Sequence, residues 1–306
     1  MNYPDKVTVV EVGPRDGLQN EASALSVAQK ATLVDKLSVS GLPIIETGSF
    51  VSPRWVPQMA DSGPVFGSIR RRPGTRYTAL TPNERGLDSA IDAQVDEVAI
   101  FAAVTESFSR KNLNASISET LQRFAPIMER ARSLNLPVRG YLSCVLGCPY
   151  EGEVSPAAVS QLTRQLLDMG CHEVSLGDTI GTGTAGSTGR LLDTLLTDGI
   201  AVEQLAMHCH DTYGQALANL VIALQYGVAT IDASIAGLGG CPYARGATGN
   251  VATEDVIYLL DGLGIEHGVD LPALLEAGRY ISQQLQRDSQ SRAARALQAA
   301  ADNSAD

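Results

Sequence analysis

The sequence predicts a single (β/α)8 barrel of the TIM type, an α/β fold in which eight parallel strands alternate with helices. Three observations support this prediction: the chain has 306 residues, short apolar runs recur along it, and stretches of helical periodicity separate those runs. Barrels of this kind often reach about 250 residues in one domain. Hydrophobic residues make up 44% of the chain and charged residues 19%, which suits a protein with a full core.

Eight apolar, β-branched runs mark the expected strands. Each run is short and almost continuously hydrophobic, as expected of parallel strands that are buried on both faces. The runs occupy residues 7–12, 44–47, 77–80, 97–101, 138–142, 173–176, 205–208 and 230–234. Because no linker or break in composition divides them, one closed barrel is favoured over two open sheets.

Helical periodicity between the runs predicts the surrounding helices. The clearest segments are 27–37, 156–169 and 215–226, which are followed by Gly41, Gly170 and Gly227 as stop signals. The alternation of strands and helices at steps of roughly 20–40 residues indicates parallel βαβ units. A doubly wound sheet would need a glycine-rich phosphate loop after an early strand. The fragment Gly181-Thr182-Gly183-Thr184 follows the sixth run and supports that alternative only weakly.

The expected domain organisation is one barrel over residues 1–286 and a tail over residues 287–306. The tail is polar and rich in alanine, so we expect a fraying helix followed by disorder. After the eighth run, residues 236–250 contain five glycines, which predicts a mobile loop that closes over the barrel as a lid.

The net charge of −11 argues against a nucleic-acid or membrane-binding function, because both need clustered basic residues. No apolar run approaches the roughly 18 residues of a membrane helix. The N-terminus leads directly into the first run without a targeting signal, so a cytoplasmic protein is expected. The five cysteines are scattered and odd in number, which argues against a disulfide framework and indicates small buried side chains.

Polar residues gather where the expected strands end. In such barrels the catalytic groups lie at the carboxyl ends of the strands, and charges buried in strands are costly unless they are paired or bind metal. The chain places ten polar residues there: Arg15, Asp16, Gln19, Glu46, Arg139, Asp178, His208, His210, Cys241 and Asn250. They indicate one shared polar pocket.

His208 and His210 are the strongest indication of a metal site. Residues two apart in a strand point to the same face, so two imidazoles can bind one ion. A single histidine is more often a hydrogen-bonded core residue, but two on one strand face favour a metal. Asp16 and Asn250 are the best-placed further ligands, although each can instead be a turn residue. Two imidazoles with oxygen ligands favour Mg²⁺ or Mn²⁺ over zinc.

The metal motif occurs together with several others. The motifs lie in residues 11–21, 49–53, 140–144, 175–181, 208–216 and the expected lid. In the lid, Cys241 lies in Gly239-Gly240-Cys241-Pro242-Tyr243. Together, from about residue 7 to 285, they resemble the hydroxymethylglutaryl-CoA lyase family. The arginine–aspartate and His-x-His motifs resemble a wider superfamily of metal-dependent lyase and aldolase barrels, whereas the cysteine motif is typical of the lyases.

The resemblance implies roles for the individual residues. Asp16, His208, His210 and Asn250 would bind the metal, Arg15 would stabilise an enolate, and Cys241 would transfer a proton. Glu46 and Asp178 would complete an acidic pocket, and the general base is either His208 or Asp178. The residues expected to contact substrate are Arg15, Gln19, Ser49, Arg139, Tyr141 and Ser175. Lys111 and Asn112, beside Arg110, are candidate contacts for the CoA anion, although a solvated surface explains them equally well.

The implied reaction is metal-dependent cleavage of 3-hydroxy-3-methylglutaryl-CoA to acetyl-CoA and acetoacetate, a step of leucine breakdown and ketone-body formation. A lyase for a larger 3-hydroxy-3-alkylglutaryl-CoA is one alternative. A Claisen-type synthase of the same superfamily is another, and a barrel that binds metal or metabolite without catalysis is the third. The expected partners are an acyl-CoA substrate and a second copy of the chain in a homodimer.

Overall fold

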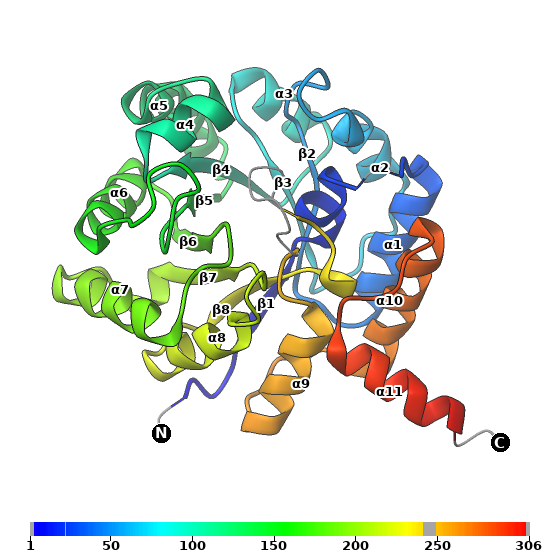
Figure 1. Ribbon diagram of the computed structural model, residues 1–306. Coiled ribbons are helices and arrows are strands. Elements are labelled where there is room, and N and C mark those ends of the chain that lie inside the picture. Colours follow the sequence, from blue (N-terminus) through cyan, green and yellow to red (C-terminus); the bar gives the residue numbers. More distant parts are fainter. Residues whose placement is uncertain (1–2, 22, 241–248, 304–306) are drawn as a thin grey trace.

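The computed structural model describes residues 3–21, 23–240 and 249–303 and has the predicted barrel architecture. Eight parallel strands pair in chain order, and β1 pairs with β8 to close the barrel. Helices surround the strands on all sides (Figure 1). The strands are β1 Thr8–Glu11, β2 Ile44–Ser49, β3 Arg76–Leu80, β4 Glu97–Ala103, β5 Val138–Ser143, β6 Glu173–Asp178, β7 Leu205–Cys209 and β8 Thr230–Ala233.

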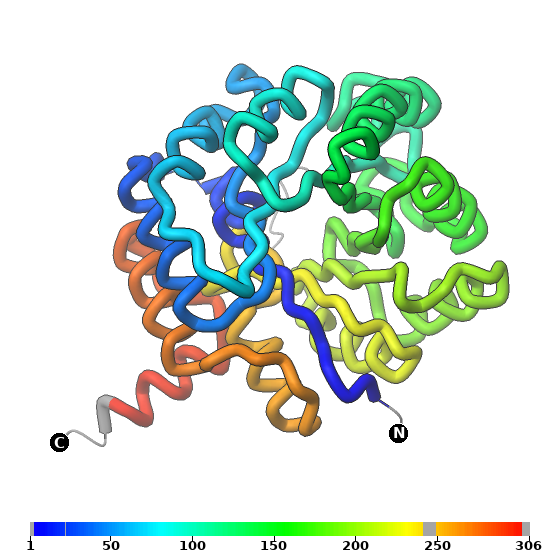
Figure 2. Tube along the Cα trace, turned by 180° about the vertical axis from the view of Figure 1, so that it is seen from behind, coloured from blue at the N-terminus to red at the C-terminus, as the bar shows by residue number. Residues whose placement is uncertain are grey.

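The helices follow the strands as βα units, and the last two pack against other helices of the surrounding layer. Their bounds are α1 Val27–Val39, α2 Ser62–Ser68, α3 Glu84–Asp92, α4 Glu106–Leu113, α5 Ile117–Ser133, α6 Pro156–Met169, α7 Ala185–Thr197, α8 Ala216–Gln225, α9 Thr253–Leu263, α10 Leu271–Leu285 and α11 Arg292–Asn303. Seen from behind the view of Figure 1, the N-terminal segment crosses one end of the barrel, and α11 projects away from the barrel (Figure 2).

The main hydrophobic core lies between the strands and the helix layer. Val9, Ile45, Val98 and Leu176 belong to this cluster and are almost completely buried. Strand side chains alternate between the two faces, so their neighbours point into the barrel instead. Several of those inward residues are charged, which places a polar interior inside an apolar shell.

The C-terminal segment contains a helix that packs on the rest of the chain. Residues 292–303 form α11, which packs against α9, and Asp255 caps its start by accepting hydrogen bonds from Ser291 Oγ and Ala293 N at 2.7 Å each. The backbone N–H of Gln290 also donates to the carbonyl of Ala236 at 3.0 Å, next to the end of β8. Side-chain contacts between segments distant in sequence therefore hold this helix, and a local pattern does not reveal them.

Candidate metal centre and active site

Three residues form a potential metal centre at the carboxyl ends of the strands. One ligand atom from each of Asp16, His208 and His210 lies within 4.8 Å of the others. His208 belongs to β7 and His210 follows it, and their ring centroids are 5.4 Å apart. Asp16 lies in a short π-helical turn, Gly13–Gly17, directly after β1. The strand therefore supplies two nitrogens on one face, and the turn supplies a carboxylate opposite them.

Asn250 adds a fourth polar group. Its Nδ2 donates to Asp16 Oδ2 at 2.9 Å and to the Leu238 carbonyl at 3.1 Å, while its Oδ1 is buried without a partner among the described residues. An isolated bridge pairs it with His210. Burial, and next the neighbouring His208, lower the pKa of His210 to about 4, so its ring is neutral as a metal ligand must be. This donor set fits a divalent cation.

Asp232 fixes the ring of His208 from inside the barrel. Its Oδ2 lies 3.3 Å from His208 Nδ1 and also accepts from Ser175 Oγ at 2.7 Å. Arg139 reaches both oxygens of Asp232, at 2.8 and 3.1 Å. Burial alone would raise the pKa of Asp232, but Arg139 and His208 outweigh it and hold the pKa well below its usual value. The aspartate is therefore ionised, which directs His208 Nε2 away from it.

Arg15 lies between two carboxylates beside the metal centre. Its Nε donates to Glu46 Oε2 at 2.5 Å and its Nη1 to Asp16 Oδ1 at 2.6 Å. Burial by itself would raise the pKa of Asp16, yet Arg15 and the two histidines lower it to about 2. Burial raises the pKa of Glu46 despite Arg15, and its Oε1 has no partner among the described residues. The guanidinium is thus fixed at the pocket wall.

Tyr141 lines the interior between two guanidinium groups. Arg15 Cζ is 5.3 Å and Arg139 Cζ 5.0 Å from its ring centroid, and the His208 ring meets it edge-on at 6.3 Å. Burial raises the pKa of Tyr141 well above its usual value, so its hydroxyl keeps its proton. The residue separates the two cations and presents a polar O–H to the cavity.

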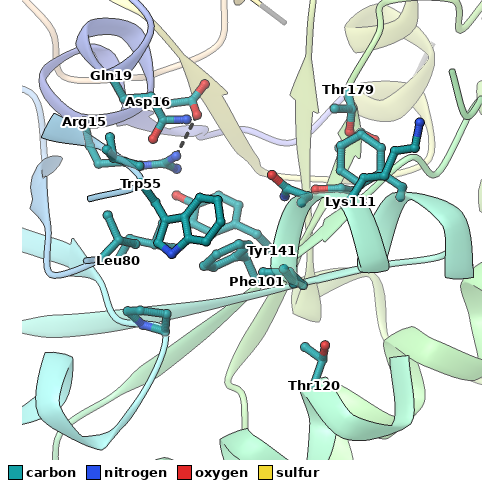
Figure 3. Close-up of a pocket in the computed structure, with 18 of the residues that line it drawn as sticks. Arg15, Asp16, Gln19, Trp55, Leu80, Phe101, Lys111, Thr120, Tyr141 and Thr179 are labelled. Carbon is teal, nitrogen blue, oxygen red and sulfur yellow. Dashed lines mark hydrogen bonds and ion pairs between the residues drawn. The ribbon is translucent and has the colours of Figure 1, made fainter. Parts of the chain in front are cut away.

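A cavity of about 940 Å³ opens above these residues. Nine of the predicted site residues line it: Arg15, Asp16, Gln19, Lys111, Asn112, Tyr141, Ser175, His208 and His210. Arg15, Asp16 and Gln19 lie on one side of the cavity, whereas Lys111 and Thr179 lie on the other (Figure 3). Asn250 joins the first group through Asp16.

The cavity has an apolar wall and a cationic mouth. Val51, Leu80 and Phe101 line the wall, and Trp55, 80% exposed, lies in front of Tyr141 and Phe101 (Figure 3). The mouth is lined by Arg110, Lys111 and Arg123. The apolar residues were missed from the sequence because they resemble ordinary core residues. The cations provide the local positive charge that an anionic ligand needs in a chain of net charge −11.

Five other predicted residues are not among those that line the cavity: Glu46 and Asn250, described above, and Ser49, Arg139 and Asp178. Arg139 lies deeper in the barrel, where it pairs with Asp232 and with Glu173 at 2.7 Å. Ser49 is buried, and its hydroxyl contacts the Leu80 carbonyl and the Val51 N–H. Ser175 and Gly177 line the cavity, so alternation places Asp178 on the outer face of β6. Cys241 lies outside the described residues.

Asp178 instead fixes the loop that follows its strand. Its two oxygens accept hydrogen bonds from the backbone N–H groups of Thr182 and Gly183, at 3.1 and 2.9 Å. Burial raises the pKa of Asp178 to about 6. Both of its oxygens thus have local partners that hold the β6–α7 loop.

Two further buried acids, unrecognised from the sequence, hold the turn that leads to the expected lid. Glu11 Oε1 accepts from Ile235 N at 2.8 Å, and Glu254 accepts from Ala236 N at 3.0 and 3.1 Å. Ala236 has a left-handed backbone with φ of 56°. At the far end of the lid, a Cβ on Gly249 would lie 2.6 Å from the carbonyls of Gly237 and Gly239. Only glycine at position 249 therefore permits the close approach of the two chain segments that lead into and out of the expected lid.

The comparison with known proteins decides the family. The HMGL-like family model matches residues 6–281. The chain belongs to the HMGL-like family. An HMGL-like relative from Pseudomonas aeruginosa, named 3-hydroxy-3-isohexenylglutaryl-CoA/hydroxy-methylglutaryl-CoA lyase, is 58% identical over 98% of this chain and 100% of its own.

Solved structures of HMGL-like proteins agree closely with this fold. The hydroxymethylglutaryl-CoA lyase from Pseudomonas aeruginosa matches with a TM-score of 0.95 at 58% identity, over 98% of this chain and 99% of its own. An HMG-CoA lyase from Acinetobacter baumannii, in complex with coenzyme A and 3-methylmalate, matches with a TM-score of 0.91 at 34% identity, over 97% and 96% of the two chains. The predicted barrel and the predicted family are confirmed.

The metal prediction is confirmed in a coarser form. Asp16, His208 and His210 can hold a divalent metal, as expected of this family, without indicating which metal. The four cysteines among the described residues are buried, as expected. Within the described part of the chain, no helix is long and apolar enough to cross a membrane.

Proposed function

We propose that this protein cleaves 3-hydroxy-3-methylglutaryl-CoA to acetyl-CoA and acetoacetate. The observation that carries the proposal is the convergence of Asp16, His208 and His210 with the fixed guanidinium of Arg15 in one cavity. Cleavage breaks the bond between C2 and C3 of the substrate. The 3-hydroxyl loses its proton and becomes the ketone of acetoacetate, and the electron pair left on C2 forms the enolate of acetyl-CoA, which then takes up a proton.

Four residues would hold the ion and orient the substrate. Asp16, His208 and His210 offer one oxygen and two nitrogens close together, and Asn250, hydrogen-bonded to Asp16, would add its Oδ1. A bound divalent cation, Mg²⁺ or Mn²⁺, would supply Lewis acidity that favours loss of the hydroxyl proton. Asp232 supports this arrangement because it keeps the Nε2 side of His208 turned towards the cavity.

Arg15 would stabilise the negative charge that develops on the thioester oxygen. A guanidinium fixed in a buried site needs no reorganisation when the enolate forms. Glu46 and Asp16 hold it from two sides at 2.5 and 2.6 Å, so its orientation is set before substrate arrives. Tyr141, packed on Arg15, closes the same wall against water.

Proton transfer would use groups on opposite sides of the cleaved bond. Of the two predicted bases, His208 lines the cavity and Asp178 does not, so we assign the hydroxyl proton to His208. Its Nδ1 faces Asp232, so Nε2 would take the proton and could not hold the ion at the same time. Glu46, whose Oε1 has no hydrogen-bond partner among the described residues, would complete the acidic pocket behind Arg15. Cys241 would deliver the proton to C2 of the enolate from the expected lid.

The deciding experiment incubates purified protein with Mg²⁺ and 3-hydroxy-3-methylglutaryl-CoA and measures acetoacetate. We expect turnover that EDTA abolishes and that Mg²⁺ or Mn²⁺ restores. A His210→Ala variant serves as the matched negative control. Absence of acetoacetate, together with condensation of acetyl-CoA and a keto acid, would replace the lyase by a Claisen-type synthase.

A second candidate substrate carries a longer 3-alkyl group. The cavity of about 940 Å³ has an apolar wall of Val51, Leu80 and Phe101, and the 58% identical relative is named for an isohexenyl as well as a methyl substrate. We therefore propose that 3-hydroxy-3-isohexenylglutaryl-CoA is also cleaved. The test compares kcat/KM for the two substrates, and a ratio below about one in a thousand for the larger one contradicts the proposal.

Three finer points belong to the same proposal. The CoA moiety would lie towards Lys111 and Asn112, opposite the metal centre, as Figure 3 shows for Lys111. The protein would act in the cytoplasm as a homodimer. Light scattering of the purified protein tests the dimer, and a mass near one chain of 32.3 kDa contradicts it.

A further inference from the structure

Lys111, at the cavity mouth, packs its ammonium group on the ring of Tyr150. Lys111 Nζ lies 4.0 Å from the centroid of that ring, which is within the range of a cation–π interaction. Tyr150 belongs to the loop between β5 and α6 and is half-buried, whereas Lys111 is exposed at the end of α4. We propose that Tyr150 is a positioning residue that holds the Lys111 ammonium over the cavity mouth to receive the anionic end of an acyl-CoA.

The loop that carries Tyr150 is closed on itself. Cys148 and Gly152 exchange two backbone hydrogen bonds of 2.8 and 2.9 Å, which forms a five-residue turn with Tyr150 at its centre. The Tyr150 backbone N–H also donates to Cys148 Sγ at 3.5 Å. The ring is therefore presented from a fixed turn rather than from a free loop.

The same turn is attached to the first turn of α4. The carboxylate of Glu151 accepts a hydrogen bond from the Ser107 backbone N–H at 2.9 Å and another from the Ser107 hydroxyl. Cys148 Sγ lies 3.1 Å from Thr105 Oγ1, just before the helix. Relative motion between the Tyr150 ring and α4 is thus restricted at two points.

Tyr150 meets the face of α4 that carries Lys111. Residues three and four apart share a helix face, and Ser107, Phe108 and Lys111 have that spacing. The Phe108 and Tyr150 rings are 6.2 Å apart with an interplanar angle of 41°, and Phe108 is buried and lines the cavity. Tyr150 therefore bridges a cavity-lining ring and the cation at the mouth.

An aromatic ring that holds the ammonium lowers the entropy cost of ordering the lysine when an anion binds. An exposed lysine has four flexible side-chain bonds, and binding an anion requires them to be ordered. A ring that already holds the ammonium reduces that cost, because fewer rotamers remain to be lost on binding. Arg110, the neighbouring cation, pairs instead with Glu106 at 3.6 Å on its own helix.

The inference rests on the proposed acyl-CoA substrate. Binding measurements distinguish a failure of the positioning role from a failure of the proposed reaction. Calorimetry would compare Kd values of CoA and of pantetheine, which lacks the phosphates, for the parent, Tyr150→Phe and Tyr150→Leu proteins. For Tyr150→Leu we expect CoA binding to weaken about two- to fivefold, while pantetheine binding and kcat stay unchanged. Tyr150→Phe keeps the ring and should bind CoA like the parent.

Two outcomes would overturn the inference. Equal weakening of CoA and pantetheine would show that the loop acts only through folding of the cavity wall. Unchanged CoA binding in Tyr150→Leu would show that the ring does not position Lys111. In a Lys111→Met background, Tyr150→Leu should add no further loss, and an added loss would equally contradict the role. If the CoA effects appear but no acetoacetate forms, the proposed reaction fails and the positioning role stands.

Discussion

His208 Nδ1 lies 3.3 Å from Oδ2 of Asp232, and this contact links the metal centre to the charged interior of the barrel. Asp232 is in turn fixed by two nitrogens of Arg139, which also pairs with Glu173. The chain of charges runs from the start of β6 to the metal-facing end of β7. Each member orients the next, and the last would orient a metal ligand, which gives this costly set of buried charges a role.

Asp232→Asn should weaken metal binding about 10- to 100-fold, the usual effect of removing a carboxylate behind a ligating histidine. The amide no longer selects the Nδ1–H tautomer of His208. Calorimetric titration with Mn²⁺ measures the effect, and circular dichroism checks the fold. The exposed Asp92→Asn variant, which removes the same charge elsewhere, should bind Mn²⁺ normally. An unchanged Mn²⁺ affinity in Asp232→Asn would refute the positioning role.

Arg15→Lys should lower kcat about 10²- to 10³-fold, comparable to the loss of one preorganised donor to an oxyanion. Lysine keeps the charge but lacks the planar fork that contacts Glu46 and Asp16 together. Steady-state kinetics gives the effect, and Arg85→Lys on the exposed face of α3 is the matched control. A drop confined to KM would mean that Arg15 binds substrate without stabilising the enolate.

His210→Ala and Cys241→Ala should separate metal binding from proton transfer. We expect His210→Ala to weaken Mn²⁺ binding directly, because one of the clustered ligand atoms is lost. Cys241→Ala should reduce kcat strongly and leave Mn²⁺ affinity within about twofold. Parallel calorimetry and kinetics on the two variants provide the comparison. Equal loss of metal in both would contradict this division of roles.

Glu254→Gln should change how stability depends on pH. Burial raises the pKa of Glu254 from 4.5 to about 8, so the folded state retains a proton that the unfolded chain releases above pH 4.5. The parent protein therefore loses stability between pH 4.5 and 8 through this group, whereas glutamine does not titrate.

Thermal denaturation at pH 5 and pH 8 measures this effect. The quantity to compare is the melting temperature of Glu254→Gln minus that of the parent. This difference should be larger at pH 8 than at pH 5 by at least about 2–4 °C, the shift that about 1 kcal/mol gives in a large domain. The Glu129→Gln variant on the exposed face of α5 should show no such change. A parallel pH dependence of the parent and Glu254→Gln would indicate that Glu254 is ionised in the folded protein.

The sequence was most informative where local patterns repeat. The runs at 97–101 and 138–142 lie within β4 and β5, and the helix expected at 156–169 has those bounds in α6. The His-x-His motif pointed to the candidate metal centre because strand geometry alone places both rings on one face. Asp232 was missed, although an acidic residue in the buried run 230–234 was the same signal that had singled out Glu46.

What the sequence by itself determined is the barrel, the family and the residues able to bind a metal, because periodicity, motif spacing and side-chain chemistry are local properties. What only the tertiary structure decided is which polar residues share the cavity. Asp178 and Ser175 are three apart on β6, yet the alternation of strand faces points one outward and the other into the site. The partners of His208 and Lys111 come from other βα units, and only closure of the barrel brings those units together.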